Sequence, residues 1–63
     1  MKQKTMLTQV YGAVRVVDPE LERNGQVGVY LGPADADDES IVKFDDDKAG
    51  HHDSFANTSL QVL

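Results

Sequence analysis

The chain has 63 residues and no cysteine, and its 11 acidic against 6 basic residues give a net charge of −5. This length allows one small domain, and the lack of cysteine excludes disulfides and thiolate metal sites. The acidic balance argues against a protein that binds nucleic-acid backbones or anionic membrane surfaces. No apolar run approaches a membrane span and no secretory leader is apparent, so we expect a cytoplasmic protein.

The first half of the chain predicts two strands separated by a loop. Residues 12–17 (GAVRVV) alternate between apolar and other side chains, as a strand with one buried face does. Residues 18–23 (DPELER) could start a helix of only about one and a half turns before an Asn-Gly turn signal, so we expect a single turn or a loop. In residues 26–31 (QVGVYL), the valines and the leucine share the predicted core face, and Tyr30 points outward.

The second half predicts shorter strands between polar turns. Gly-Pro at positions 32–33 is expected to close the second strand, and a third strand is predicted at 40–44 (SIVKF). The last strand region is predicted within 54–63, with a 3₁₀ turn at 57–59 (NTS). We expect one domain over 1–63, with residues 1–9 as a loose lead-in.

These elements predict an all-β fold, a small barrel of about five short antiparallel strands. The predicted core consists of apolar side chains on the inward strand faces and in the first loop: Val14, Val16, Leu21, Val27, Val29, Leu31, Val42, Phe44, Phe55, Leu60 and Val62.

The order of these pieces resembles the small SH3-like barrels, including KOW-type modules. The matching segments are 12–16 (GAVRV), 25–29 (GQVGV), 42–46 (VKFDD) and 60–63 (LQVL). The resemblance implies an SH3-like barrel, a fold that serves in ribosomal proteins, transcription factors and peptide readers. Fold alone does not decide among these functions.

Two polar loops carry residue types that bind metals. The first contains Asp35, Asp37, Asp38 and Glu39, oxygen ligands of the kind that Ca²⁺ takes. The second contains Asp45, Asp46, Asp47, His51, His52 and Asp53, a set that could hold Zn²⁺. The ordinary interpretation of both is a solvated loop, so we expect no metal and no cofactor.

A possible partner-binding face combines aromatic and cationic side chains. Its candidate residues are Tyr11, Arg15, Arg23, Tyr30 and Lys43. Aromatic rings beside cations can stack on bases or grip a peptide. The alternative is that both tyrosines simply cover the second side of the barrel, with their hydroxyls in water.

No catalytic set is evident in the sequence. We therefore expect a small non-enzymatic module that binds a protein partner, or itself, through an exposed barrel face. One alternative is a KOW-like accessory module associated with nucleic acid, which the negative charge disfavours. Another is an oligomeric enzyme with a site built at a shared interface, because the chain also resembles the tetrameric type II dihydrofolate reductases. Here 40–43 (SIVK) stands where their Val-Gln-Ile-Tyr run would be.

Overall fold

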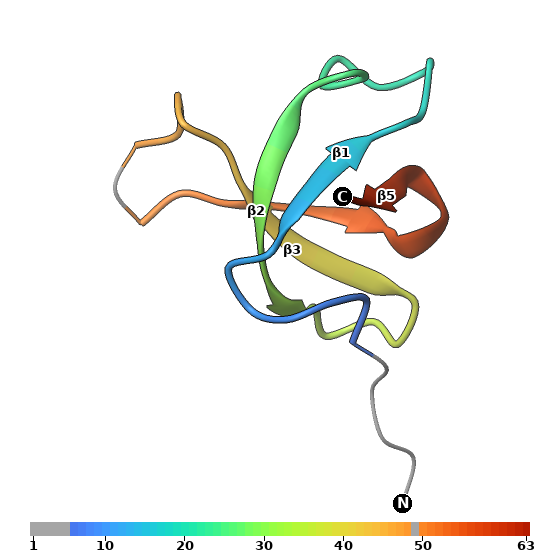
Figure 1. Cartoon of the computed structure of the whole chain (residues 1–63), viewed down its shortest axis with the longest axis vertical. Helices are drawn as coiled ribbons and strands as arrows, with labels where there is room; N and C mark the ends of the chain where they lie inside the picture. Colours follow the sequence, from blue (N-terminus) through green and yellow to red (C-terminus); the bar gives the residue numbers. More distant parts are fainter. Residues whose placement is uncertain (1–5, 49) are drawn as a thin grey trace, which may run out of the picture.

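Five antiparallel strands form one curved sheet in the computed structural model, which describes residues 6–48 and 50–63. The elements are β1 (Ala13–Val16), β2 (Val27–Pro33), β3 (Glu39–Lys43), β4 (Asp53–Ala56), the 3₁₀ turn η1 (Asn57–Ser59) and β5 (Leu60–Val62). The strand order across the sheet is β4-β3-β2-β1-β5 (Figure 1). The prediction of an all-β fold with five short antiparallel strands is confirmed.

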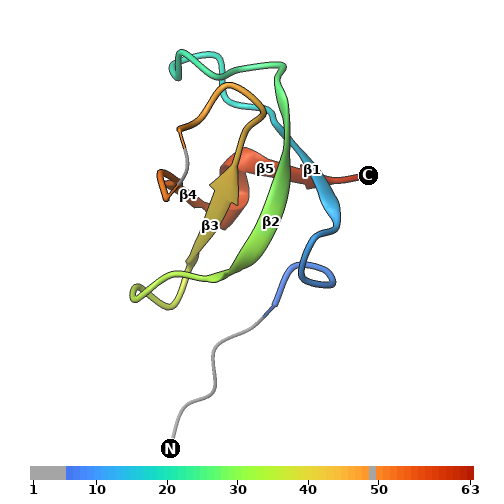
Figure 2. The ribbon, with the colours of Figure 1, turned by 90° about the vertical axis from the view of Figure 1, so that its left-hand side faces the viewer.

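β2 is the longest strand and lies between β1 and β3, as Figure 2 shows. Its first residues pair with β1, where Val29 lies opposite Ala13, and its later residues pair with β3. The register with β3 shifts between Tyr30 and Gly32, which marks a β-bulge. Bulges bend a strand and increase its twist, so this irregularity helps to curve the sheet around the core.

The core is small and aromatic. Its buried side chains come from four strands and the residue after β3: Val14, Val16, Tyr30, Val42, Phe44 and Phe55. The rings of Phe44 and Phe55 meet edge to face, with centroids 5.8 Å apart, an arrangement that aromatic pairs favour. Leu7, Leu21 and Leu60 pack against this cluster from outside.

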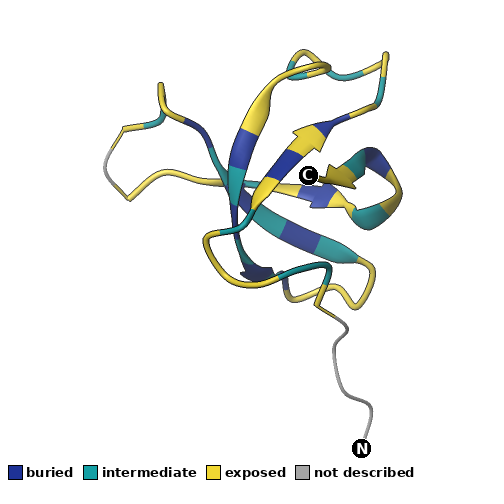
Figure 3. Ribbon diagram, in the orientation of Figure 1, coloured by how far each residue is buried: buried dark blue, intermediate teal, exposed yellow. Residues whose placement is uncertain are grey.

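The prediction for the two faces of β2 is wrong. Tyr30 is 0% exposed and belongs to the core, whereas Val27 is 47% exposed. Gly28 and Tyr30 are buried, whereas Val27 and Val29 are more exposed, and Figure 3 shows buried and more exposed segments alternating along the strands. The large tyrosine ring fills the core on the same face of the strand as Gly28, and the apolar side chains of the other face point outward. Val62, also predicted as core, is 45% exposed on β5.

Most strand positions and the connections agree with expectation. Residues 18–23 form turns, and the 3₁₀ turn at Asn57–Ser59 is confirmed. The second strand continues past Leu31 and ends at Pro33, which lies opposite Ser40. Proline is tolerated at the end of a strand, and the next residue still donates across to β3, from the Ala34 N–H to the Glu39 carbonyl at 2.9 Å.

The lead-in predicted for residues 1–9 lies partly outside the described residues, which begin at Met6. In the described part, Leu7 packs against the core, and its backbone N–H is 3.4 Å from the Tyr30 hydroxyl. Among the described residues, no helix is long and apolar enough to cross a membrane.

Candidate functional site

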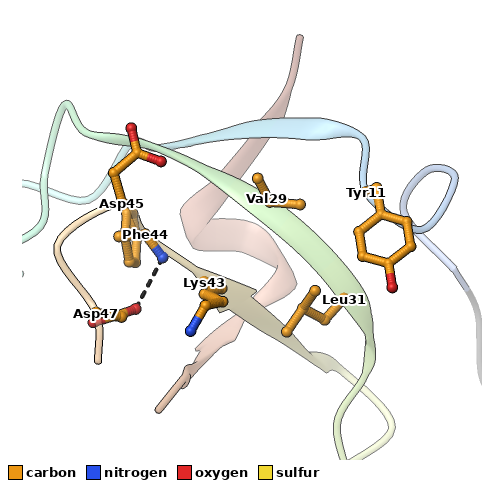
Figure 4. A pocket seen from close by; sticks show the side chains of 7 residues that line it. All are labelled: Tyr11, Val29, Leu31, Lys43, Phe44, Asp45 and Asp47. Carbon is orange, nitrogen blue, oxygen red and sulfur yellow. Dashed lines mark hydrogen bonds between the residues drawn. The ribbon is translucent and has the colours of Figure 1, made fainter. Parts of the chain in front are cut away.

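A groove of about 370 Å³ lies over the outer face of β2 and β3. Its lining combines apolar side chains with one lysine and two aspartates: Tyr11, Val29, Leu31, Lys43, Phe44, Asp45 and Asp47. Figure 4 shows Tyr11 at one end, Asp45 and Asp47 at the other, and Val29, Leu31 and Lys43 between them.

The strand alternation explains the apolar floor of the groove. Because Gly28 and Tyr30 face the core, Val29 between them faces outward, and Leu31 at the bulge also lines the groove. Val29 lies opposite Lys43 in the register between β2 and β3, and this places both side chains on the same outer face. All three of these lining residues are only partly buried, so the groove presents apolar surface to solvent.

Tyr11 has an unusual backbone and an exposed ring. Its φ angle is +72°, and it is the one non-glycine residue with positive φ in the described part of the chain. Its N–H donates to the Tyr30 carbonyl at 2.7 Å, which anchors the backbone, while the residue stays 78% exposed. A bulky residue in this conformation costs about 1–2 kcal/mol. A strained aromatic residue that the fold does not bury is typical of a functional position.

The aspartate end of the groove is held in place by hydrogen bonds. The side chain of Asp47 is only 3% exposed. Its Oδ2 accepts the Phe44 N–H at 2.8 Å, and its Oδ1 accepts from Arg23 Nη2 at 3.0 Å. Asp45 is exposed, so its carboxylate is the negative charge that the groove offers to solvent.

Arg23 joins the loop after β1 to the loop after β3. Its Nη1 donates to Gln26 and to Asp46 at 2.8 Å each, and its guanidinium lies 4.2 Å from the centre of the Phe44 ring. The hydrogen bond between Arg23 and Asp46 raises the pKa of Arg23 and lowers the pKa of Asp46. Arg23 is therefore a structural brace between the two loops, and it does not line the groove.

Of the five residues predicted for the binding face, the structure brings two together in the groove. Tyr11 and Lys43 line it, and Lys43 Nζ also donates to the carbonyls of Lys48 and His51 at 3.1 Å each. Arg15 is exposed on β1 opposite Val27, outside the groove lining. Tyr30 is in the core, so the prediction that it is the leading outward candidate is wrong.

Sequence reasoning missed the role of Val29 and Leu31 in the groove. The signal available in the sequence was the flanking Gly28, because a strand glycine often marks close approach to another element. With the glycine assigned to the inner face, the alternation would have placed both apolar side chains outside.

The two polar loops differ in how they arrange their side chains. In the first loop, residues 35–38 are exposed, and Glu39 begins β3. In the second, Asp47, His51 and Asp53 bring one potential ligand atom each within 4.8 Å of one another. This is the one such group found among residues 6–48 and 50–63, and His52 is not part of it.

Compared with family models, curated proteins and solved structures, the chain matches none of them.

Proposed function

We propose that this chain is a non-enzymatic module that binds an extended segment of a protein partner in the groove over β2 and β3. The observation that carries the proposal is Tyr11, an exposed aromatic residue in a strained conformation at one end of an apolar groove. Tyrosine is among the residues that contribute most to binding at protein interfaces, because its large ring loses little conformational entropy.

The shape of the floor favours an extended occupant. Val29 and Leu31 are two positions apart on one strand, so they lie roughly 7 Å apart along it. Alternate side chains of an extended peptide have the same spacing, and they could contact both floor residues and the Tyr11 ring together.

Charge favours an occupant with basic side chains. The chain carries a net charge of −5, and the far end of the groove offers the exposed Asp45 carboxylate. A partner segment with apolar residues followed by lysine or arginine complements both features. The same net charge disfavours a second acidic copy of this chain as the occupant.

The relation to SH3-like barrels is part of the proposal. The order of strands along the chain, with η1 before β5, supports the resemblance found in the motif order. The nucleic-acid alternative loses support because Arg23 and Lys43 direct their charged groups to partners within the chain. Fewer cations are then available to phosphates.

Selection of random peptides displayed on phage against the immobilised chain tests this function. We expect the enriched peptides to share apolar residues at alternate positions and at least one arginine or lysine. Synthetic peptides from that selection should bind the Leu31→Lys variant at least about tenfold more weakly, because the change places a cation on the apolar floor. Val62→Lys adds the same charge at an exposed apolar position of β5, outside the groove, and should leave affinity unchanged.

Equal binding to wild type and to Leu31→Lys would overturn the proposal, as would selected peptides without a common pattern. Circular dichroism of both variants shows whether each keeps its β-sheet fold. Light scattering over a concentration series tests whether a second copy of the chain occupies the groove. A stable wild-type dimer that the Leu31→Lys change dissociates would show that it does, and would overturn a separate protein partner as the occupant.

A further inference from the structure

Three side chains of metal-binding type converge where the loop after β3 meets β4. The His51 Nε2 atom lies 3.8 Å from Asp47 Oδ1 and 3.5 Å from Asp53 Oδ1. Both separations exceed those of ordinary hydrogen bonds. Two ligand atoms that each bind a tetrahedral ion at about 2.1 Å lie roughly 3.4 Å from each other. The two separations from His51 are therefore close to those between ligands of one shared ion, and all three residues offer a ligand atom within 4.8 Å of the others.

One of the three ligands is already fixed by the fold. Asp47 is nearly buried, and its carboxylate is oriented by the Phe44 N–H and by Arg23. Hydrogen bonds to a ligating carboxylate are the usual outer support of metal sites. Oδ1 has two lone pairs, so the bond from Arg23 leaves one of them for a cation.

The donor set specifies the class of ion. One imidazole nitrogen and two carboxylate oxygens, without thiolate, suit a borderline divalent ion such as Zn²⁺, and the imidazole disfavours Mg²⁺ and Ca²⁺. Two carboxylates match a double positive charge, although the nearby Arg23 and Lys48 oppose it. A hollow of about 380 Å³, lined by Asp46, Asp47, Lys48 and His51, leaves room for water at a fourth position.

We propose that Asp47, His51 and Asp53 bind one divalent transition-metal ion of the Zn²⁺ class. The site differs from the groove that defines the proposed function, although Asp47 borders both. It spans the loop and the first residue of β4, so an ion there would tie the two segments together.

Isothermal titration calorimetry of the untagged full chain with Zn²⁺ tests the site. We expect saturable binding of one ion per chain. His51→Gln and Asp53→Asn should each weaken binding at least about tenfold. His52→Gln is the matched control, since it removes the neighbouring exposed imidazole outside the cluster and should change affinity less than about twofold. Asp47 is left intact because its carboxylate also caps the Phe44 N–H.

A second measurement identifies the nitrogen that binds the ion. Two-bond proton–nitrogen spectra of the imidazole rings should show Zn²⁺ shifting Nε2 of His51, with the nitrogens of His52 unmoved. Absence of saturable binding would overturn the site, and so would equal weakening by His52→Gln and His51→Gln. Because the ion is tested without peptide, failure here leaves the groove proposal standing, and failure of the groove leaves this site standing.

Discussion

The backbone of Gly28 lies directly against the side chain of Val42, where a Cβ atom on Gly28 would stand 2.6 Å from Val42 Cγ1. The same Cβ would lie 2.9 Å from the Lys43 carbonyl oxygen. This close approach lets β2 and β3 curve tightly around the core. It also fixes which face of β2 is buried, and with it the position of the groove.

Gly28→Ala is expected to destabilise the fold. The added methyl group would overlap a buried side chain and a backbone oxygen that cannot move freely, and such overpacking costs about 1–3 kcal/mol. Urea denaturation should show a lower midpoint, with the slope unchanged. Val27→Ala, at the exposed neighbouring position, should stay within about 0.5 kcal/mol of wild type. A Gly28→Ala protein as stable as wild type would contradict the close approach.

The fold class was predictable from the sequence because turn residues and period-2 patterns mark short strands in many positions. The alternating pattern of β1 gave the correct face, since Val14 and Val16 alternate with Ala13 and Arg15. β2 was harder to predict, because alternation shows which residues share a face but not which face is buried. Val27, Val29 and Leu31 are the more apolar set, so the pattern favoured burying them. Tertiary packing instead buries the face that carries Gly28 and the large ring of Tyr30.

Tyr30 provides a test of that choice. Tyr30→Ala should remove about 3–5 kcal/mol, because it empties the centre of the core. That is a large part of the stability of a small domain, so the variant should be mostly unfolded by circular dichroism. Tyr30→Phe keeps the ring and loses only the long contact with the Leu7 N–H, so it should stay within about 1 kcal/mol of wild type. A stable, folded Tyr30→Ala protein would contradict the placement of Tyr30 in the core.

Arg23 is expected to stabilise the two loops that it joins. Arg23→Gln leaves the nearly buried Asp47 carboxylate without its cationic partner and removes the contact over the Phe44 ring. The melting temperature should fall, and the amide of Phe44 should exchange faster with solvent. Arg15→Gln makes the same change at an exposed arginine on β1, where a surface substitution should leave the melting temperature nearly unchanged. Equal effects of the two changes would argue against the brace.

The site was less predictable than the fold because its parts meet only through the sheet register and long-range bonds. Arg23 and Asp46 are 23 positions apart, and nothing in their local sequence pairs them. His51 and His52 are adjacent histidines that the sequence does not distinguish, yet only His51 places a ring nitrogen near the carboxylates of Asp47 and Asp53. Tyr11 could be named from its residue type alone, but no local sequence pattern indicates its positive φ or the bond of its N–H to the Tyr30 carbonyl.

Tyr11→Asn should separate stability from binding. Asparagine tolerates positive φ, so the strain of the tyrosine backbone is relieved and stability should stay unchanged or rise by up to about 1 kcal/mol. Peptides selected against the wild type should bind about tenfold more weakly, because truncating an interface tyrosine costs more than about 1 kcal/mol. Urea denaturation and peptide titration of the same sample measure both quantities.

Tyr11→Phe is the control for this separation. It keeps the ring and the strained backbone, so both stability and peptide affinity should remain close to wild type. Two results would contradict the role given to Tyr11. Unchanged affinity in Tyr11→Asn would remove the ring from the binding surface, and a loss of stability beyond about 1 kcal/mol would show that the ring packs in the fold. The expected opposite responses follow from one fact, that the fold holds the Tyr11 backbone in a costly conformation while leaving the residue 78% exposed.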